Sequence, residues 1–593
     1  MFMWRSAPES WSVTQLVSQA PTPEPMTQPL TEKDPAAPAS GDGAPPKPLI
    51  ALRRAVIEVA DGLADAAPDG ARPQGTITLE RPKRAEFGDY STNAALLLAK
   101  GLGAPPREVA ERLGEALRER LGASLERFEV AGPGFVNLFL TDSWLTGALA
   151  RALAVGEELG MDTVGRPERI IVEFVSANPT GPMHVGHARN AAYGDALGRM
   201  LALHGHTVER EFYVNDAGSQ VRIFGESVQA QAVGQEIPEG GYKGDYVAEL
   251  AARLPGAATM DAGELGRAAV AAMVEEIKVS LARFRVEGFD RWFFESSLHD
   301  GDPSPFTQVL SALAERDLTY RKDGALWLRT SDFGDDKDRV LERSDGEHTY
   351  FATDIAYHQD KRNRGFERQI DVWGADHHGY LLRMKAAYAA LGGDPDELEL
   401  LIMQLVHLVR SGERAQMSKR AGEFVSLDDL VAEIGVDAAR WYLLARSHDT
   451  TVDLDLDLAR EQSNENPVYY VQYAHARISS MLARAGAERA SGATASVEDP
   501  GRAPLEPAER ALIEQVLAFE EELAEAVERR APHRIATYAL ELAQGFTTFY
   551  TDCRVLGAEP ANVESLRIAL CVATMRTIAR CLAILGVGAP DRM

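Results

Sequence analysis

The chain has 593 residues, of which 45% are hydrophobic and 25% are charged, and its formal net charge is −27 at pH 7. Because single hydrophobic cores stop growing at about 250 to 300 residues, this length predicts two to four domains. The acidic balance excludes a protein that is basic all over, as histones are. It is compatible with a local basic surface, since binding fields depend on how charge is distributed.

The first 47 residues are rich in Pro, Ala, Ser and Gly. Such a stretch buries too little apolar surface to offset the entropy lost on ordering, so residues 1–47 are predicted to be a disordered extension. Their start lacks the continuous apolar segment of a signal peptide, and no later run approaches the roughly 18 to 20 apolar residues of a membrane span. We therefore expect a cytoplasmic protein without a membrane segment.

Residues 48–157 alternate between helical and strand patterns. Helical periodicity covers 49–66, 95–103 and 107–122, whereas 76–82 and 134–140 have the composition of strands. Short elements of both kinds in one stretch of this length predict a small α+β domain at the N-terminal side of the chain.

Residues 158–452 begin with an apolar run from Ile170 to Val175, broken only by Glu173, which predicts a buried strand. A Pro/Gly turn follows, then a helix over 187–203 that ends at Gly205, and a second strand over 207–214. This order predicts a βαβ unit and hence a Rossmann-like parallel sheet. In QIDVWGADHHGY an apolar strand opens into polar residues, and ligands bind at the carboxyl ends of such strands.

After about Asp453 the strand patterns stop. Helical periodicity covers 467–486, 509–530, 534–553 and 565–585, and an Ala/Ser/Gly/Pro linker is predicted at about 486–505. The three cysteines of the chain lie here without a CxxC pair, which indicates a reducing compartment. Residues 453–593 are predicted to form an all-α bundle, so the predicted fold class is multidomain α/β.

The turn PTGPMHVGH places His184 and His187 three residues apart, and three interpretations compete. Zinc would need a third ligand, which the sequence does not supply convincingly, because His204 and His206 lie at the far end of the predicted helix. Inert core histidines are the second interpretation. The third is phosphate binding, because a helix N-terminus offers unpaired N–H groups and Gly186 leaves room for a nucleotide. We favour the third and predict no bound metal.

A second polar stretch, GERAQMSKRAGEFVSLDDL, carries Lys419 and Arg420 in a short loop between helical patterns. Taken alone, such a basic pair is most often a solvated loop. Together with the HVGH turn upstream, it favours a nucleotide site that draws on both segments.

The two motifs resemble the HIGH and KMSK signatures of class I aminoacyl-tRNA synthetases, and their surroundings resemble the arginyl-tRNA synthetases over roughly residues 50 to 593. The segments that carry this resemblance are VEFVSANPTGPMHVGHARNAAYGDAL, FGDDKDRV, DGEHTYFATDIAYH, DVWGADHHGYLLRMKAA, MSKRAGEFVSLDDL and NPVYYVQYAHARI. The departures are small. Gln416 stands where the family often has lysine, so Lys419 is the only motif lysine.

The resemblance implies a ligase that joins arginine to ATP, with release of pyrophosphate, and then transfers arginine to the terminal ribose of tRNA(Arg). Mg²⁺ is expected on the ATP phosphates. His184, His187 and Lys419 would be catalytic, because this chemistry requires alignment and stabilisation of phosphoryl charge. The residues implied to bind ATP are Pro179, Thr180, Gly181, His184, Gly186, His187, Met417, Ser418 and Lys419.

For arginine, a guanidinium requires carboxylates and planar acceptors. The resemblance implies Glu173, Ser176, Asn178, Tyr350, Asp354, Asp376 and His377. Two alternatives stay open, namely that Glu173 is an exposed edge residue and that Asp354 is the N-cap of a helix over 355–362.

For tRNA, the domain at 48–157 is similar to the family's added domain that contacts the tRNA elbow, and the bundle is implied to bind the anticodon. Phe135 and Asn137 are exposed-looking candidates for base contacts, although core strand positions are an equally good interpretation. Tyr469, Tyr473, His475 and Arg477 are the candidates in the bundle, where packing of the tyrosines into the core is the alternative. We expect a monomer.

Three other functions were weighed. A small-molecule adenylyl- or nucleotidyltransferase can share the HxGH turn but does not explain the helical tail or the added N-terminal domain. A synthetase-like protein that only binds RNA would be expected to lose the HxGH turn or the lysine. A metal hydrolase built on His184 and His187 is the least favoured.

Overall fold

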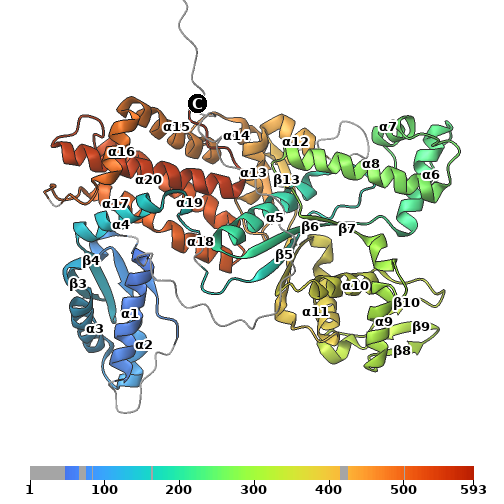
Figure 1. Cartoon of the computed structure of the whole chain (residues 1–593), viewed down its shortest axis with the longest axis horizontal. Helices are drawn as coiled ribbons and strands as arrows, with labels where there is room; N and C mark the ends of the chain where they lie inside the picture. Colours follow the sequence, from blue (N-terminus) through green and yellow to red (C-terminus); the bar gives the residue numbers. More distant parts are fainter. Residues whose placement is uncertain are drawn as a thin grey trace, which may run out of the picture. The chain divides into compact units, whose positions relative to one another are not determined.

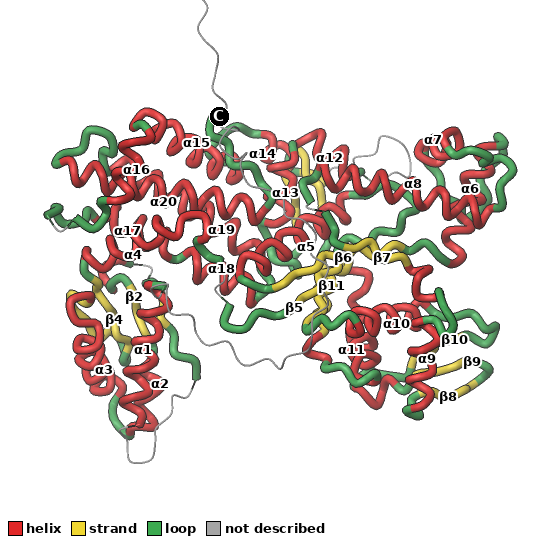
Figure 2. Tube along the Cα trace, in the orientation of Figure 1, coloured by secondary structure: helices red, strands yellow, loops and turns green. Residues whose placement is uncertain are grey.

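The computed structural model describes residues 47–593 apart from 66–74, 83, 162–163, 287, 415–424 and 500 (Figures 1 and 2). The predicted extension before residue 47 and the predicted ATP-binding residues Met417, Ser418 and Lys419 therefore lie outside the described residues. Pro48–Met593 forms one compact unit, and all that follows concerns this unit.

A small α+β layer begins the unit. Its antiparallel sheet has the strand order β1-β2-β4-β3, and the helices bury Leu52, Leu98 and Leu113 against it. The predicted strand at 76–82 is only two residues long. The elements are α1 (Pro48–Asp65), β1 (Leu79–Glu80), β2 (Tyr90–Thr92), α2 (Ala94–Leu102), α3 (Pro106–Leu121), β3 (Leu125–Ala131), β4 (Phe135–Leu140) and α4 (Asp142–Val155).

The central sheet is parallel throughout, with the order β12-β11-β5-β6-β7. Its strands are β5 (Arg169–Glu173), β6 (Thr207–Val214), β7 (Arg291–Phe294), β11 (Arg368–Gly374) and β12 (Leu398–Met403). Between β5 and β6 runs the predicted crossover helix α5 (Val185–His204), which ends at Gly205 with φ 113°. The sequence therefore predicted the βαβ unit correctly. Helix α5 begins two residues earlier than expected, because His184 caps it.

Two insertions interrupt the sheet. Between β6 and β7 lie α6 (Gly218–Ala232), α7 (Asp245–Arg253) and α8 (Ala262–Arg283). Helices α6 and α8 touch through glycines, because a Cβ on Gly225 would lie 1.8 Å from the Ala262 carbonyl oxygen. The second insertion, between β7 and β11, contains η5 (Glu295–His299), α9 (Pro305–Glu315), β8 (Thr319–Lys322), β9 (Ala325–Leu328), η6 (Thr330–Phe333), β10 (Arg339–Glu342) and α10 (Tyr350–Asn363).

Three short elements connect β11 to β12, namely η7 (Ala375–Tyr380), α11 (Leu381–Ala390) and η8 (Pro395–Glu397). After β12 the chain leaves the parallel sheet and runs to the bundle through β13 (Val406–Arg410), β14 (Glu413–Arg414), α12 (Leu427–Ile434), α13 (Val436–Leu444), β15 (Val452–Asp455) and α14 (Leu456–Arg460). Strands β14, β13 and β15 form a small sheet of their own.

The C-terminal bundle is helical, as predicted, but its divisions differ. Helix α16 occupies part of the expected linker, and the expected helix at 509–530 is two helices. The elements are α15 (Pro467–Ala485), α16 (Ala487–Ala495), α17 (Pro507–Leu517), α18 (Phe519–Glu528), α19 (Pro532–Asp552) and α20 (Ala561–Leu585). Within the described residues, α20 alone is long and apolar enough to cross a membrane, and 72% of its most apolar stretch is buried in the protein.

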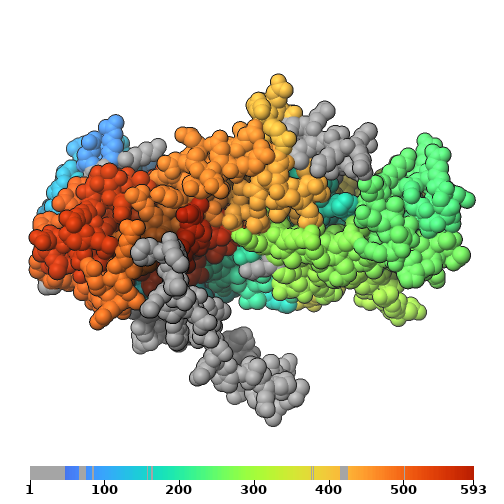
Figure 3. Space-filling model, turned by 90° about the horizontal axis from the view of Figure 1, so that it is seen from above, coloured from blue at the N-terminus to red at the C-terminus, as the bar shows by residue number. Residues whose placement is uncertain are grey.

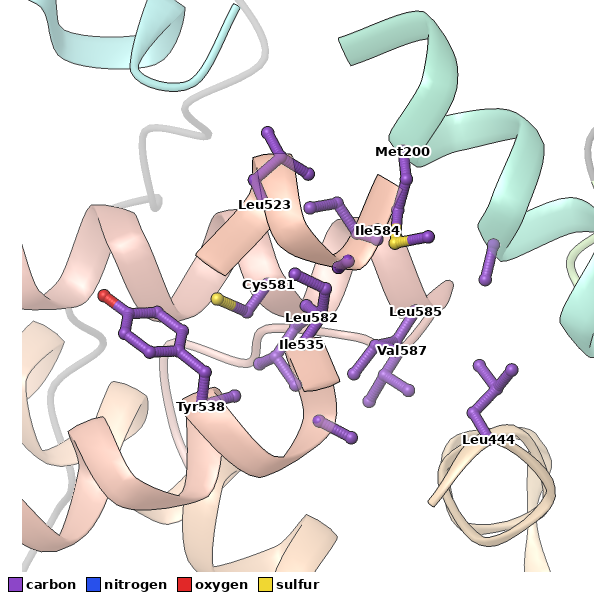
Figure 4. Packing of buried hydrophobic residues seen from close by; sticks show 14 of the residues in the cluster. Met200, Leu444, Leu523, Ile535, Tyr538, Cys581, Leu582, Ile584, Leu585 and Val587 are labelled. Carbon is purple, nitrogen blue, oxygen red and sulfur yellow. The ribbon is translucent and has the colours of Figure 1, made fainter. Parts of the chain in front are cut away.

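One continuous core joins the parallel-sheet region to the bundle. In Figure 4, Met200 of α5 and Leu444 of α13 lie near Ile535 of α19 and Leu585 of α20. A buried arginine ties the same elements together, because Arg440 of α13 donates to the Leu585 carbonyl oxygen at 2.7 Å and pairs with Asp195 of α5. The last helix of the bundle therefore belongs to the core against which α5 packs.

Candidate active site

The turn after β5 is strained. Val175 and Ser176 have φ angles of 69° and 38°, a region that β-branched and other non-glycine residues rarely enter and that costs about 1–3 kcal/mol per residue. This backbone ends β5 at Glu173, two residues before the predicted end. The Val175 N–H donates to Asn190 Oδ1 at 2.6 Å, and Asn190 Nδ2 donates to the Val372 carbonyl oxygen at 2.7 Å. Helix α5 and strand β11 therefore hold the turn in place.

A buried cluster of charges lies beneath that turn. Lys361 Nζ contacts Glu173 Oε2 at 2.6 Å and Asp371 Oδ1 at 2.7 Å, and His358 Nε2 lies 2.7 Å from Asp371 Oδ2. Burial opposes the charge of Lys361, but the two carboxylates raise its pKa. Burial raises the pKa of Glu173. For Asp371, burial would raise the pKa, but Lys361 and His358 together outweigh it and lower the pKa to about 2. Lys361 and Asp371 are therefore a charged pair at neutral pH.

Glu173 has protein partners for both carboxylate oxygens. Its second oxygen, Oε1, accepts from Ser176 Oγ at 2.7 Å, and the same hydroxyl accepts from the Tyr213 N–H at 3.2 Å. The Glu173 side chain is 6% exposed, so the alternative of an exposed edge residue is wrong. Glu173 fixes Ser176 and thereby the strained turn.

His184 and His187 lie together at the N-terminus of α5. Their rings stack with centroids 3.7 Å apart. His184 Nδ1 accepts from the Gly186 N–H at 3.1 Å, and His187 Nδ1 accepts from the His184 N–H at 3.3 Å. Burial lowers the pKa of His184, and burial with the neighbouring His184 lowers that of His187 to about 3. Both rings are therefore neutral at pH 7 and carry their proton on Nε2.

The HxGH turn is hydrogen-bonded to a segment far along the chain. The Val185 N–H donates to the Val425 carbonyl oxygen at 3.1 Å, and the Leu427 N–H donates to that of Met183 at 2.8 Å, around a bridge between His184 and Ser426. Residues 425–427 directly follow the undescribed stretch that holds Lys419. The two polar motifs therefore belong to one region of the fold.

A second pair of carboxylates, the buried Glu295 and the partly buried Asp354, lies at the end of β7 and in the first turns of α10. Asp354 Oδ2 accepts from Tyr380 Oη at 2.6 Å, and burial raises the pKa of Asp354. Burial also raises the pKa of Glu295, to about 7, with the charge of Asp354 adding to the shift and a hydrogen bond from Tyr213 opposing it. The charge of Asp354 thus contributes to the raised pKa of Glu295, and a pair of carboxylates in such surroundings is a candidate site for a cation.

Helix α10 begins at Tyr350, and its N-cap is Thr349, whose hydroxyl accepts from the Ala352 N–H. Asp354 lies one turn inside the helix, so the alternative that Asp354 is an N-cap is wrong. Tyr350 is 59% exposed at the first turn, above Asp354.

Glu295 was not predicted from the sequence. The signal was present in RWFFESS, where an apolar strand runs directly into an acidic residue, as in the strand that opens into GADHH. Because β7 is short and at the edge of the sheet, its pattern alone does not distinguish a strand from a loop.

The other predicted residues of this site lie around the same turn. Asn178 is exposed, Pro179 and Thr180 are buried, and the Thr180 N–H donates to the Asn178 carbonyl oxygen at 2.8 Å. His377 is exposed, with its ring centroid 5.5 Å from that of Trp373. The side chain of Asp376 lies outside the described residues.

The residues predicted to contact tRNA divide into exposed and buried ones. Phe135 is 39% exposed, but Asn137 is 3% exposed and accepts from Ser91 Oγ at 2.8 Å, so its expected exposure is wrong. Because both faces of β4 are covered, alternate positions along the strand do not separate surface from core.

In the bundle, Tyr469 and Tyr473 of α15 stack with centroids 6.2 Å apart, and Tyr473 is 41% exposed. Arg477 is exposed and lies over the Tyr550 ring at 4.3 Å. His475, in contrast, is 5% exposed, and its Nδ1 lies 2.9 Å from the Pro590 carbonyl oxygen. It therefore holds the C-terminal tail and does not present an edge to a base.

Comparison with family models gives three matches in chain order. An arginyl tRNA synthetase N-terminal domain matches residues 51–140, and a catalytic domain of class I (R) tRNA synthetases matches 149–237 and 295–479. A DALR anticodon binding domain matches residues 471–593.

Curated relatives and solved structures agree with these models. An arginine–tRNA ligase of Geobacillus kaustophilus is 44% identical over 91% of this chain and 98% of its own, and one of Bacillus subtilis is 44% identical over 87% and 94%. The arginyl-tRNA synthetase of Thermus thermophilus superposes with a TM-score of 0.71 and 25% identity over 92% of this chain and 100% of its own. A Campylobacter jejuni protein described as an arginyl tRNA synthetase superposes with a TM-score of 0.70 and 34% identity. The match covers 77% of this chain and 100% of its own.

Proposed function

The chain belongs to the arginyl-tRNA synthetase family and is an arginine–tRNA ligase, and we propose that its first reaction takes place at the ends of β5, β6, β7 and β11. The enzyme uses ATP to activate L-arginine as arginyl-adenylate and transfers the arginyl group to the 3′-terminal ribose of tRNA(Arg). The observation that supports this placement is the pairing of the HxGH turn with residues 425–427, which directly follow the stretch that holds Lys419.

ATP binds with its phosphates over the N-terminus of α5. The neutral rings of His184 and His187 donate from Nε2, and the backbone of Thr180–Gly181 and Gly186 lies close to the nucleotide. Lys419 with Met417 and Ser418 approaches from the other motif, and Pro179 shapes the turn. These donors stabilise charge on the α-phosphoryl oxygens and the leaving pyrophosphate without having to reorganise.

The chemical step needs no general base. The arginine carboxylate attacks the α-phosphorus, a new P–O bond forms as the bond to the bridging oxygen breaks, and pyrophosphate leaves with the electron pair. Because the nucleophile is already charged, the protein contributes alignment and electrostatic stabilisation.

Mg²⁺ accompanies ATP in this proposal. Residues 179–187 contain imidazole, hydroxyl and backbone N–H groups and no Asp or Glu. Such a turn suits a cation that is held by phosphate oxygens and water, not by a cage of protein carboxylates. When bound, the ion neutralises part of the triphosphate charge, and the two histidines and α5 act on the remainder.

Arginine places its guanidinium between Asp354 and Glu295, with the exposed ring of Tyr350 above it. Two carboxylates match the planar fork of donors, which lysine lacks. Ser176 and Asn178 receive the backbone end of the substrate, and His377 and Asp376 stay candidates at the end of β11. Glu173 acts through Ser176 and has its own oxygens engaged by the protein.

tRNA is the partner of both outer regions. Residues 48–157 contact the elbow through Phe135, residues 158–452 hold the active site, and residues 453–593 contact the anticodon through Tyr469, Tyr473 and Arg477. The family models that match in this order support the division. The proposal includes a monomer that acts in the cytoplasm, where tRNA is charged, and has no membrane-bound state.

ATP–pyrophosphate exchange with each of the twenty amino acids, with and without total tRNA, tests the substrate and the reaction together. We expect exchange with arginine alone among the amino acids. Exchange that depends on a different amino acid would contradict the proposed pocket, and a failure with every amino acid in the presence of tRNA would favour a protein that only binds RNA.

A further inference from the structure

Helix α7 contacts the turn that leads to the HxGH motif. Tyr246 Oη donates to the Thr180 carbonyl oxygen at 2.9 Å. The phenol ring lies against Gly181, because a Cβ built on this glycine would stand 3.4 Å from Tyr246 Oη and 3.6 Å from Cζ. The matched catalytic domain covers residues 149–237 and 295–479, so Tyr246 lies in a segment that the family model does not describe.

The Thr180 carbonyl group lies in a turn whose backbone has few hydrogen-bond donors of its own. Pro179 and Pro182 flank Thr180 and Gly181 and have no N–H, so the backbone cannot donate hydrogen bonds at either position. Thr180 is 8% exposed, and its own N–H is taken by Asn178. A donor from outside the turn therefore fixes the direction of this peptide group, which in turn sets the path into His184.

The helices around Tyr246 are held in place by buried apolar and aromatic contacts. Val247 and Leu250 of α7 are buried, and the Tyr246 ring centroid lies 6.4 Å from that of Phe224 in α6. Helix α8 reaches the other side of the paired segments, because Ser280 Oγ donates to Asp428 Oδ2 at 2.5 Å in the first turn of α12. Figure 3 shows the surface of α8 lying against that of α12 and α13. The insertion thus contacts Thr180 and Asp428, which lie next to the paired segments 183–185 and 425–427.

We propose that Tyr246 is a positioning residue for ATP. Its hydroxyl holds the Thr180–Gly181 peptide, and its ring closes the open side of Gly181, so the backbone is set before the triphosphate arrives. This inference rests on the proposed placement of ATP over the turn. It assigns a role to the insertion between β6 and β7, and Tyr246 itself touches no reacting atom.

The variant Tyr246→Phe keeps the ring and removes the hydroxyl. Loss of one hydrogen bond of about 0.5–1.5 kcal/mol corresponds to roughly a two- to twelvefold effect. We expect the KM for ATP in pyrophosphate exchange, measured with tRNA present, to rise by about this factor, while the KM for arginine stays within about twofold. Calorimetric titration of the wild type and the variant with ATP should give the same ratio of dissociation constants.

Tyr242→Phe is the matched control. Tyr242 is a partly buried tyrosine of the same insertion whose ring also contacts Phe224, but its hydroxyl donates to Gln220 and not to the turn. We expect both KM values of this variant to equal those of the wild type. Thermal unfolding of both variants should match the wild type within about 2 °C, which separates positioning from a loss of fold.

Three results would overturn the inference. The first is an unchanged KM and Kd for ATP in Tyr246→Phe. The second is a proportional rise of the KM for ATP and for arginine, which would indicate a general disturbance. The third is an ATP defect in Tyr246→Ala but none in Tyr246→Phe, which would leave only ring packing. If the wild type showed no arginine-dependent exchange, the proposed function would fail, and ATP titration would still test Tyr246 by itself.

Discussion

Four carboxylates near the strained turn, of which Asp354 is partly buried and the other three are buried, have different partners. Glu173 and Asp371 share Lys361, whereas Asp354 and Glu295 have the hydroxyls of Tyr380 and Tyr213 as partners. Burial is tolerated by the first two because an internal cation is present. No lysine or arginine is among the described hydrogen-bond partners of the second two, which supports the proposal that the substrate guanidinium binds there.

Glu295→Gln removes one charge of this pair. Hydrogen bonds to charged groups contribute about 1.5–3 kcal/mol, so we expect the KM for arginine at pH 8 to rise roughly 10- to 150-fold. The KM for ATP should change little. The exposed residue Glu347, whose ion pair with Arg343 is on the surface, provides the control variant Glu347→Gln. An unchanged arginine KM in Glu295→Gln would remove Glu295 from the pocket.

The same residue sets an expected pH dependence. The folded pKa of Glu295 is raised from 4.5 to about 7, so its protonated form stabilises the fold at low pH and this stabilisation is lost as pH rises from about 4.5 through 7. Arginine needs the ionised form, so kcat/KM for arginine should rise with pH up to about 7 and then level off. Glu295→Gln should remove much of this rise and should unfold at an equal or higher temperature than the wild type at pH 8.

Some of these residues were predicted from the sequence, and others were missed for physical reasons. His184, His187 and Asp354 stand in motifs whose order carries the family resemblance. The Nδ1 contacts that set the tautomers of the histidines depend on the three-dimensional turn and could not be predicted. Asn137 and His475 were expected at the surface because strand and helix periodicity do not reveal which neighbours cover a face.

At the scale of elements, α15 is the clearest candidate for contact with unpaired bases. Tyr469 and Tyr473 lie one turn apart with rings nearly parallel, at 8°, and Arg477 follows one turn later. The exposure of Tyr473 rules out full packing in the core and leaves a face on which a base can stack.

Tyr473→Ala tests this face. Stacking of one base on an aromatic ring contributes about 1–3 kcal/mol, so we expect the KM for tRNA in aminoacylation to rise roughly 5- to 150-fold. The KM values for arginine and ATP should not change. Tyr470→Phe on the same helix, which loses a hydrogen bond to Thr547, is the control and should leave tRNA binding intact. Equal tRNA affinity of Tyr473→Ala and the wild type would contradict the role of α15.

Among the elements, β5, α5 and β6 were predictable because a buried apolar run, a helix-terminal glycine and a second strand follow one another directly. The position and the three helices of the insertion α6–α8 were not predicted from the sequence. Their proposed role depends on contacts with Thr180 and Asp428, and local sequence patterns do not predict such contacts. The break between α17 and α18 was missed because helical periodicity continues across it.

At the scale of the whole molecule, Arg440 connects segments that the sequence places in separate domains. It is fully buried, with Asp195 in α5 and the Leu585 carbonyl oxygen in α20 as partners. Arg440→Met should lower the free energy of unfolding by about 3–5 kcal/mol, because the buried Leu585 and Phe284 carbonyl oxygens lose their donor and Asp195 keeps only Arg199 as its arginine partner. Urea unfolding measures this, and Arg343→Met, at an exposed ion pair, should cost less than about 1 kcal/mol. An equal loss of unfolding free energy in both variants would contradict the role of Arg440 in connecting these segments.

The position of these partners affects the order in which the chain can fold. Besides Leu585, the Gly588 N–H donates to Asp437 at 2.8 Å, and the Pro590 carbonyl oxygen contacts His475. Domains fold as units during synthesis, beginning at the N-terminal side, so residues 48–157 can fold early. Leu585 is translated 145 residues after Arg440, and until then the arginine lacks this acceptor. The core around α5 can therefore be completed only once the bundle has been translated.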